Sequence, residues 1–155
     1  MQKKRKAPRL ILFWALAVGW IAVLFFFSGQ TAAESGRLSG TLADFVRGIF
    51  PFNRIPPDQL EHVLRKLAHF SIFALEGFLL CLAMTESSGE ISVGAALSVI
   101  VCTALAAGNE LHQMFSEGRS CEGRDVLIDT GGALLGVAAA LLLWIIRRWK
   151  RARSG

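Results

Sequence analysis

Hydrophobic residues in this chain are gathered into four long runs, separated by segments rich in charge, glycine and proline. Each run approaches the roughly 20 residues that an α-helix needs to cross a bilayer. The pattern therefore predicts an all-α membrane protein, in which a bundle of four transmembrane helices forms one domain. The expected spans cover about residues 10–27, 67–84, 91–111 and 126–146, within a domain of residues 10–146 that lies between tails of residues 1–9 and 147–155.

The segment between the first two runs has a helical pattern of its own. Apolar residues recur there among polar ones, at Leu38, Leu42, Phe45, Val46 and Ile49. This spacing predicts an amphipathic helix in the first outer loop, which either packs on the bundle as a lid or contributes to ligand access. Pro51, Pro56 and Pro57 then interrupt the chain. Pro57 suits the first turn of a new helix, which would run for about 28 residues into the second span.

Composition and charge indicate a topology. Of the 155 residues, 53% are hydrophobic, a share that soluble domains seldom reach. Five Lys or Arg residues precede the first run and five follow the last. By the positive-inside rule both tails are cytoplasmic, and residues 28–66 and 112–125 are outer loops of a multi-pass protein in the cell membrane. The first run is longer than the apolar core of a secretory signal, which favours an uncleaved anchor.

The net charge of +5 does not indicate nucleic acid as a partner. The tail clusters adjoin hydrophobic runs, where anionic lipid of the bilayer is the simpler partner. Of the cysteines, Cys81 and Cys102 fall within spans and Cys121 lies in the second outer loop, so a structural disulfide is not expected.

Seven polar or charged residues interrupt or border the last three runs. They are Lys66, His69, Glu76, Glu110, Gln113, Asp125 and Asp129. An ionisable group in hydrocarbon costs at least about 2.5 kcal/mol, so several on neighbouring helices indicate a functional site. Helical spacing puts His69, Glu110 and Asp129 at similar depth near the outer surface, with Glu76 about 15 Å below Lys66. The spacing predicts an outward-facing polar pocket with Glu76 at its floor.

Some of these residues also have a structural interpretation. Asp125 suits the cap of the last helix, where the helix dipole favours negative charge. Lys66 can extend to the lipid headgroups, as lysines at the ends of spans usually do. His112 is expected to be a solvated loop residue. Gly132 and Gly136 indicate close helix packing in preference to a ligand site.

Three blocks of the sequence resemble the VanZ-like membrane proteins: RKLAHFSIFALEG at 65–77, NELHQMFSEGR at 109–119 and RDVLIDTGGALLG at 124–136. Phe27, Ser28 and Gln30 also resemble a sequence common after that family's first span. Glu117 and Gly131 depart from the family pattern, which often has proline at the first position and a larger apolar residue at the second. The matching positions are Lys66, His69, Phe70, Glu110, Gln113, Phe115, Gly118, Arg119, Asp125, Asp129, Gly132 and Gly136.

The resemblance implies a site that opens toward the cell envelope. It also implies a link to low-level resistance to glycopeptide antibiotics such as teicoplanin, and hence an envelope lipid or a glycopeptide-related ligand as a partner. It implies no particular reaction.

Three kinds of function remain open. The first is a non-catalytic protein that binds an envelope component through the polar residues. The second is an enzyme in which His69, Glu110 and Asp129 perform acid–base chemistry or hold a divalent cation. Lys66 and Arg119 would then clamp a phosphate or carboxylate.

The third kind is a proton-coupled transporter around Glu76, although no broken helix marks a transport site. The sequence has no Cys or Ser nucleophile signature and no metal motif such as His-Glu-x-x-His. It therefore assigns neither a reaction nor a cofactor.

Overall fold

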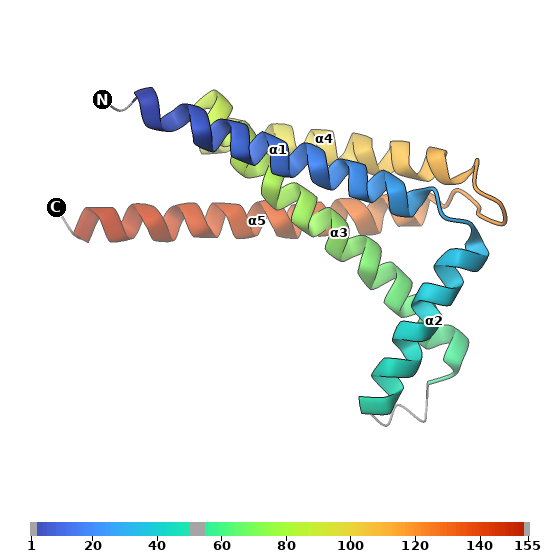
Figure 1. Cartoon of the computed structure of the whole chain (residues 1–155). Coiled ribbons are helices and arrows are strands. Elements are labelled where there is room, and N and C mark those ends of the chain that lie inside the picture. Colours follow the sequence, from blue (N-terminus) through green and yellow to red (C-terminus); the bar gives the residue numbers. More distant parts are fainter. Residues whose placement is uncertain (1–2, 50–54, 154–155) are drawn as a thin grey trace.

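The computed structural model describes residues 3–49 and 55–153, so Pro51 and the outermost tail residues lie outside the described chain. The described residues form helices without any strand. Four of the helices are long and apolar enough to cross a membrane, and α2 connects the first two of these (Figure 1). The predicted four-helix bundle with an additional amphipathic helix is therefore confirmed. The helices are α1 (Lys3–Ser28), α2 (Ala32–Ile49), α3 (Pro57–Ser88), α4 (Ile91–Gln113) and α5 (Gly123–Arg153).

Helix α3 is the centre of the molecule, because it packs against each of the other four helices. Figure 1 shows both termini and the α3–α4 turn at one end of the bundle. The α1–α2 and α4–α5 connections lie at the opposite end, which we call the loop end. Helix α2 crosses the direction of α1, α4 and α5 steeply there. This arrangement suits an interfacial helix, because α2 then lies across the direction of the spans.

Three helix boundaries differ from those expected. Helix α3 has 32 residues where about 28 were predicted, and Gly89 ends it with a left-handed φ of 77° and an N–H that donates to the Thr85 carbonyl. The turn expected over residues 85–90 is thus reduced to two residues. His112 lies in the last turn of α4 and not in a loop. Asp125 lies inside the first turn of α5 and not at its cap.

The closest helix packing joins α3 and α5. A Cβ added to Gly132 would overlap the Phe70 carbonyl oxygen, and one added to Gly136 would overlap that of Ala74. Glycine therefore lets the two backbones approach, which is the packing role expected from the sequence. Both contacts advance by four residues on both helices, so α3 and α5 run in the same direction through this contact.

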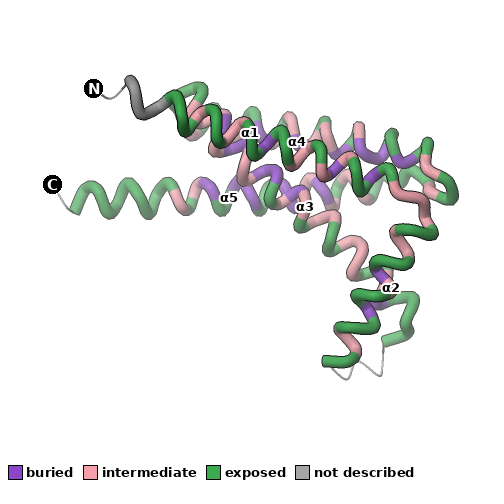
Figure 2. Tube along the Cα trace, in the orientation of Figure 1, coloured by how far each residue is buried: buried purple, intermediate pink, exposed green. Residues whose placement is uncertain are grey.

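Helix α1 is attached to the opposite side of α3 by tryptophan side chains. The Trp20 indole N–H donates to the Ile72 carbonyl at 2.9 Å, and that of Trp14 donates to Ser87 Oγ at 2.9 Å. Figure 2 shows buried positions where the helices face one another and exposed positions on the outside and on the final turns of α5. Large apolar residues such as Ile100 and Leu135 are among the exposed ones, as expected of surfaces that contact lipid.

We expect Gly132→Ala to lower the stability of the folded protein by about 1–3 kcal/mol, because the new methyl group collides with the backbone of α3. Gly131→Ala is the matched control, since a Cβ there meets only Phe70 Cε2 at 3.7 Å, an ordinary contact. Thermal unfolding in detergent measures both. Equal melting temperatures for the two variants would contradict the close α3–α5 contact.

Candidate functional site

Polar side chains from three helices meet at the loop end of the bundle. We define the polar cluster as Lys66 and His69 of α3, Glu110 of α4, Asp125 and Asp129 of α5, and Glu122 of the α4–α5 loop. Lys66 of α3 pairs with Asp125 of α5, and His69 of α3 lies next to Asp129 of α5. Asp125 and Asp129 are four residues apart on α5, and their partners Lys66 and His69 are three residues apart on α3.

Lys66 is the cation of the cluster. Its ammonium group donates to Asp125 Oδ1 and lies 3.7 Å from Glu122 Oε2. The Lys66 and Asp125 side chains retain only 20% and 18% of their exposure. Lys66 therefore pairs within the protein and does not extend to the headgroups, and Asp125 is its partner and not a helix cap.

His69 and Asp129 form a looser pair. His69 Nδ1 lies 3.7 Å from Asp129 Oδ1, which exceeds the length of a hydrogen bond. Asp129 is fully buried, and neither of its carboxyl oxygens has a hydrogen-bond partner among the described residues. An imidazole beside a carboxyl group is a common arrangement for proton transfer or for orienting a ring.

Glu110 faces this pair from α4. Its Oε2 accepts a hydrogen bond from the Glu122 backbone N–H at 3.0 Å, while Oε1 has no partner in the described chain. Glu110 is close enough to His69, Asp125 and Asp129 for their charges to interact. Buried carboxyl groups are normally fully hydrogen-bonded, so the free oxygens of Glu110 and Asp129 are suited to a donor, a cation or a proton.

Arg119 lies beside the cluster in the α4–α5 loop, directly after Gly118, whose φ is 75°. Burial lowers the pKa of the Arg119 guanidinium, and the nearby charge of Arg65 acts in the same direction. Glu110 and Asp125 oppose this effect on its pKa, which places Arg119 within electrostatic range of two carboxyl groups. Its expected role as an anion clamp stays a prediction.

Two other expected site residues form no hydrogen bond or ion pair with the cluster among the described residues. Glu76 is fully buried beside Cys102 of α4, and neither of its oxygens has a hydrogen-bond partner among the described residues. Phe73, 1% exposed, occupies the face of α3 between His69 and Glu76. Gln113 is buried at the end of α4, and its Nε2 also lacks a partner in the described chain. The polar pocket expected above Glu76 stays a prediction.

The sequence interpretation missed three residues near the site. Glu122 contributes both its carboxylate and its backbone N–H to the cluster, but it lies in a loop where no periodicity indicates a partner. Asn109 is 1% exposed and directly precedes Glu110, a position that could have indicated it. Ser28 is buried, and its Oγ lies 3.2 Å from His112 Nδ1 and donates to the Asn109 carbonyl at 3.4 Å. A serine at the end of an apolar run was the available signal.

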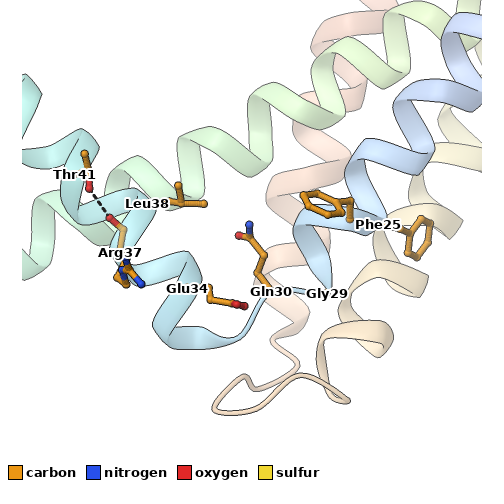
Figure 3. A pocket seen from close by; sticks show the side chains of 8 residues that line it. Phe25, Gly29, Gln30, Glu34, Arg37, Leu38 and Thr41 are labelled. Atoms are coloured by element: carbon orange, nitrogen blue, oxygen red, sulfur yellow. Dashed lines mark hydrogen bonds between the residues drawn. The ribbon is translucent and has the colours of Figure 1, made fainter.

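A pocket of 670 Å³ lies at the same end of the molecule, between the last turns of α1 and the first turns of α2 (Figure 3). Its lining includes Phe25, Phe26 and Arg37, and none of its lining residues belongs to the polar cluster. It is therefore a different feature from the polar pocket that the sequence predicts.

Over residues 3–49 and 55–153, no group of three or more His, Cys, Asp or Glu side chains is arranged to hold a metal ion.

Comparison with known proteins gives one match. The family model VanZ/LLP1 matches residues 13–146, a range that includes every member of the polar cluster. No curated protein and no solved structure matches the chain.

Proposed function

The chain belongs to the VanZ/LLP1 family, and from this premise we propose that it binds or acts on a component of the cell envelope through the polar cluster. We further propose that this role is linked to resistance to glycopeptide antibiotics of the teicoplanin type. One observation carries the proposal. Two buried carboxyl groups, Glu110 and Asp129, face His69 across three helices and keep acceptor oxygens without a partner in the described chain.

If the cluster had only a structural role, we would expect its buried polar groups to have all their hydrogen bonds satisfied. Buried polar groups that only support a fold are stabilised by saturating their hydrogen bonds, because each unmet group costs free energy. Lys66 and Asp125 follow this rule, whereas both oxygens of Asp129 do not. The unmet acceptors support a role in which an external polar ligand completes the network.

The charge of the tails supports an orientation. Ten of the 17 Lys and Arg residues lie in the two terminal tails, which Figure 1 places at one end of the bundle. By the positive-inside rule this end is cytoplasmic, and the loop end with the polar cluster is then exposed to the envelope.

Cys121 offers a test of this orientation. It is an exposed free cysteine in the α4–α5 loop, whereas Cys81 and Cys102 are buried in the bundle. We expect a membrane-impermeant maleimide to label the wild-type protein on intact cells and to leave Cys121→Ser unlabelled. Permeabilised cells give the maximum signal. Labelling of Cys121 only after permeabilisation would place the loop end in the cytoplasm and contradict the orientation.

The cluster itself can be tested with a resistance measurement. We expect Glu110→Ala and Asp129→Ala to abolish the glycopeptide-resistance phenotype that the wild-type chain confers on a susceptible host. The physical reason is that each substitution removes acceptor oxygens that the proposed ligand requires. Inhibitory concentrations of teicoplanin are compared at equal amounts of membrane-inserted protein.

Glu117→Ala is the matched control, because Glu117 is exposed in the same loop and lies outside the cluster. We expect this variant to retain the phenotype. Full activity of both cluster variants would mean that the cluster is structural.

The proximity of His69 to Asp129 favours an enzyme as the second candidate. In that case His69 would act as a general acid or base on an envelope lipid, with Asp129 orienting the ring and Glu110 as the second acid–base group. The transporter alternative receives less support, because α3 continues unbroken past Glu76 and transport sites are usually formed by discontinuous helices.

Product analysis separates the enzyme from the binding protein. If the chain is an enzyme, incubating the purified protein with envelope lipids yields a new species by mass spectrometry, and His69→Ala reduces its rate of formation by about 100-fold or more. Parallel samples with and without chelator report any dependence on a metal. A wild-type sample without a protein-dependent product would contradict catalysis and leave binding as the function.

A further inference from the structure

The pocket between α1 and α2 combines apolar and polar walls. Phe25 and Phe26 line it from the last turns of α1, and Arg37, Leu38 and Thr41 line it from α2. Figure 3 shows the space between these two helices, with Gln30 at their junction. Its volume of 670 Å³ falls in the range of small-molecule sites, which is about 300–1,000 Å³. The walls suit a molecule that has both an apolar and a polar part.

The position of the pocket relative to the bilayer indicates which kind of molecule can reach it. The first span ends at Ser28, and α2 begins at Ala32 and crosses the direction of the spans (Figure 1). On α2 the apolar residues Leu38, Phe45 and Ile49 remain 53%, 65% and 57% exposed. An amphipathic helix that keeps such a face uncovered at the end of a span lies in the lipid interface. The pocket is therefore at the level where headgroups meet acyl chains.

The pocket is lined by one acidic and one basic side chain, Glu34 and Arg37, and only the carboxylate of Glu34 is held by hydrogen bonds within the described chain. Glu34 Oε2 accepts hydrogen bonds from the Thr31 backbone N–H at 2.9 Å and from Thr31 Oγ1 at 3.1 Å, and Glu34 N–H donates to Thr31 Oγ1. This capping box holds the carboxylate at the start of α2, and the Thr31 hydrogen bonds lower the pKa of Glu34. Arg37 is exposed one turn further on, and its charge interacts with that of Glu34. Its planar guanidinium is suited to the oxygens of a phosphate group.

We propose that this pocket is a binding site for an anionic phospholipid, with its phosphate at Arg37 and one acyl chain against Phe25 and Phe26. The site goes beyond the proposed function and does not depend on it. The phosphate lies at the level of Arg37 and Gln30, while the chain follows α1 into the bilayer. Leu38 adds an apolar contact to the pocket wall from α2.

The headgroup part of the proposal can be tested by lipid retention. The purified full chain is reconstituted into nanodiscs of phosphatidylglycerol and phosphatidylcholine in equal amounts, released into detergent, and examined by native mass spectrometry. We expect the wild-type protein to retain one phosphatidylglycerol in preference to phosphatidylcholine. Arg37→Gln should weaken this retention about tenfold, because it removes a charge-assisted hydrogen bond. Arg124→Gln, the same change at an exposed position of α5 outside the pocket, should have no effect.

A second pair of variants tests the acyl-chain part. Phe26→Ala should reduce retention, because its ring lines the pocket, while Phe45→Ala at an exposed position of α2 outside the lining should not. Equal melting temperatures establish that all variants are folded. The proposal is overturned if the wild-type protein shows no preference for phosphatidylglycerol, or if Arg37→Gln retains it as well as Arg124→Gln does. Equal retention by both phenylalanine variants would overturn the placement of the chain.

Discussion

The close parallel contact between α3 and α5 determines the rest of the structure. Gly132 and Gly136 allow the α5 backbone to meet the carbonyls of Phe70 and Ala74, and the contact repeats every four residues on both helices. Toward the loop end, the same two helices bring Lys66 to Asp125 and His69 to Asp129. The ion pair of Lys66 and the pairing of His69 therefore depend on backbone packing that begins within one turn of Asp129. A shift of one residue along either helix would separate both pairs.

The cost of burying charge in a membrane then explains which groups of the cluster are paired within the protein and which can bind a ligand. Removing two charges from water costs more than their attraction returns unless the geometry is good and the remaining hydrogen bonds are made. Lys66 meets this condition with Asp125 and with Glu122 close by. Asp129 is more deeply buried, and its nearest ionic partner is His69 at 3.7 Å. The free-energy cost of burying polar groups without partners therefore falls mainly on Asp129 and on Oε1 of Glu110. A ligand or a proton would stabilise the protein most at these atoms.

The sequence predicted those features that depend on the pattern within a single helix. Hydropathy indicated the four long apolar helices, and spacing placed Lys66 with His69 and Asp125 with Asp129, because helical periodicity is a local property. It missed Glu122, because a loop N–H that donates to Glu110 follows from tertiary structure and leaves no periodic signal. It also ended α3 too early, since no residue after Met84 breaks the helix until Gly89 adopts a positive φ. The separation of the α1–α2 pocket from the cluster likewise required the three-dimensional arrangement.

The α4–α5 loop connects the two features of the loop end. Near its start, the Glu117 carbonyl accepts a hydrogen bond from the Ala32 N–H at 3.0 Å, which fixes the loop to the first turn of α2. At its end, the Glu122 N–H donates to Glu110 Oε2. Gly118, with a φ of 75°, lets the loop turn between these two attachments where it passes Ala32. The loop backbone that donates to Glu110 is therefore also attached to the helix that forms one wall of the pocket.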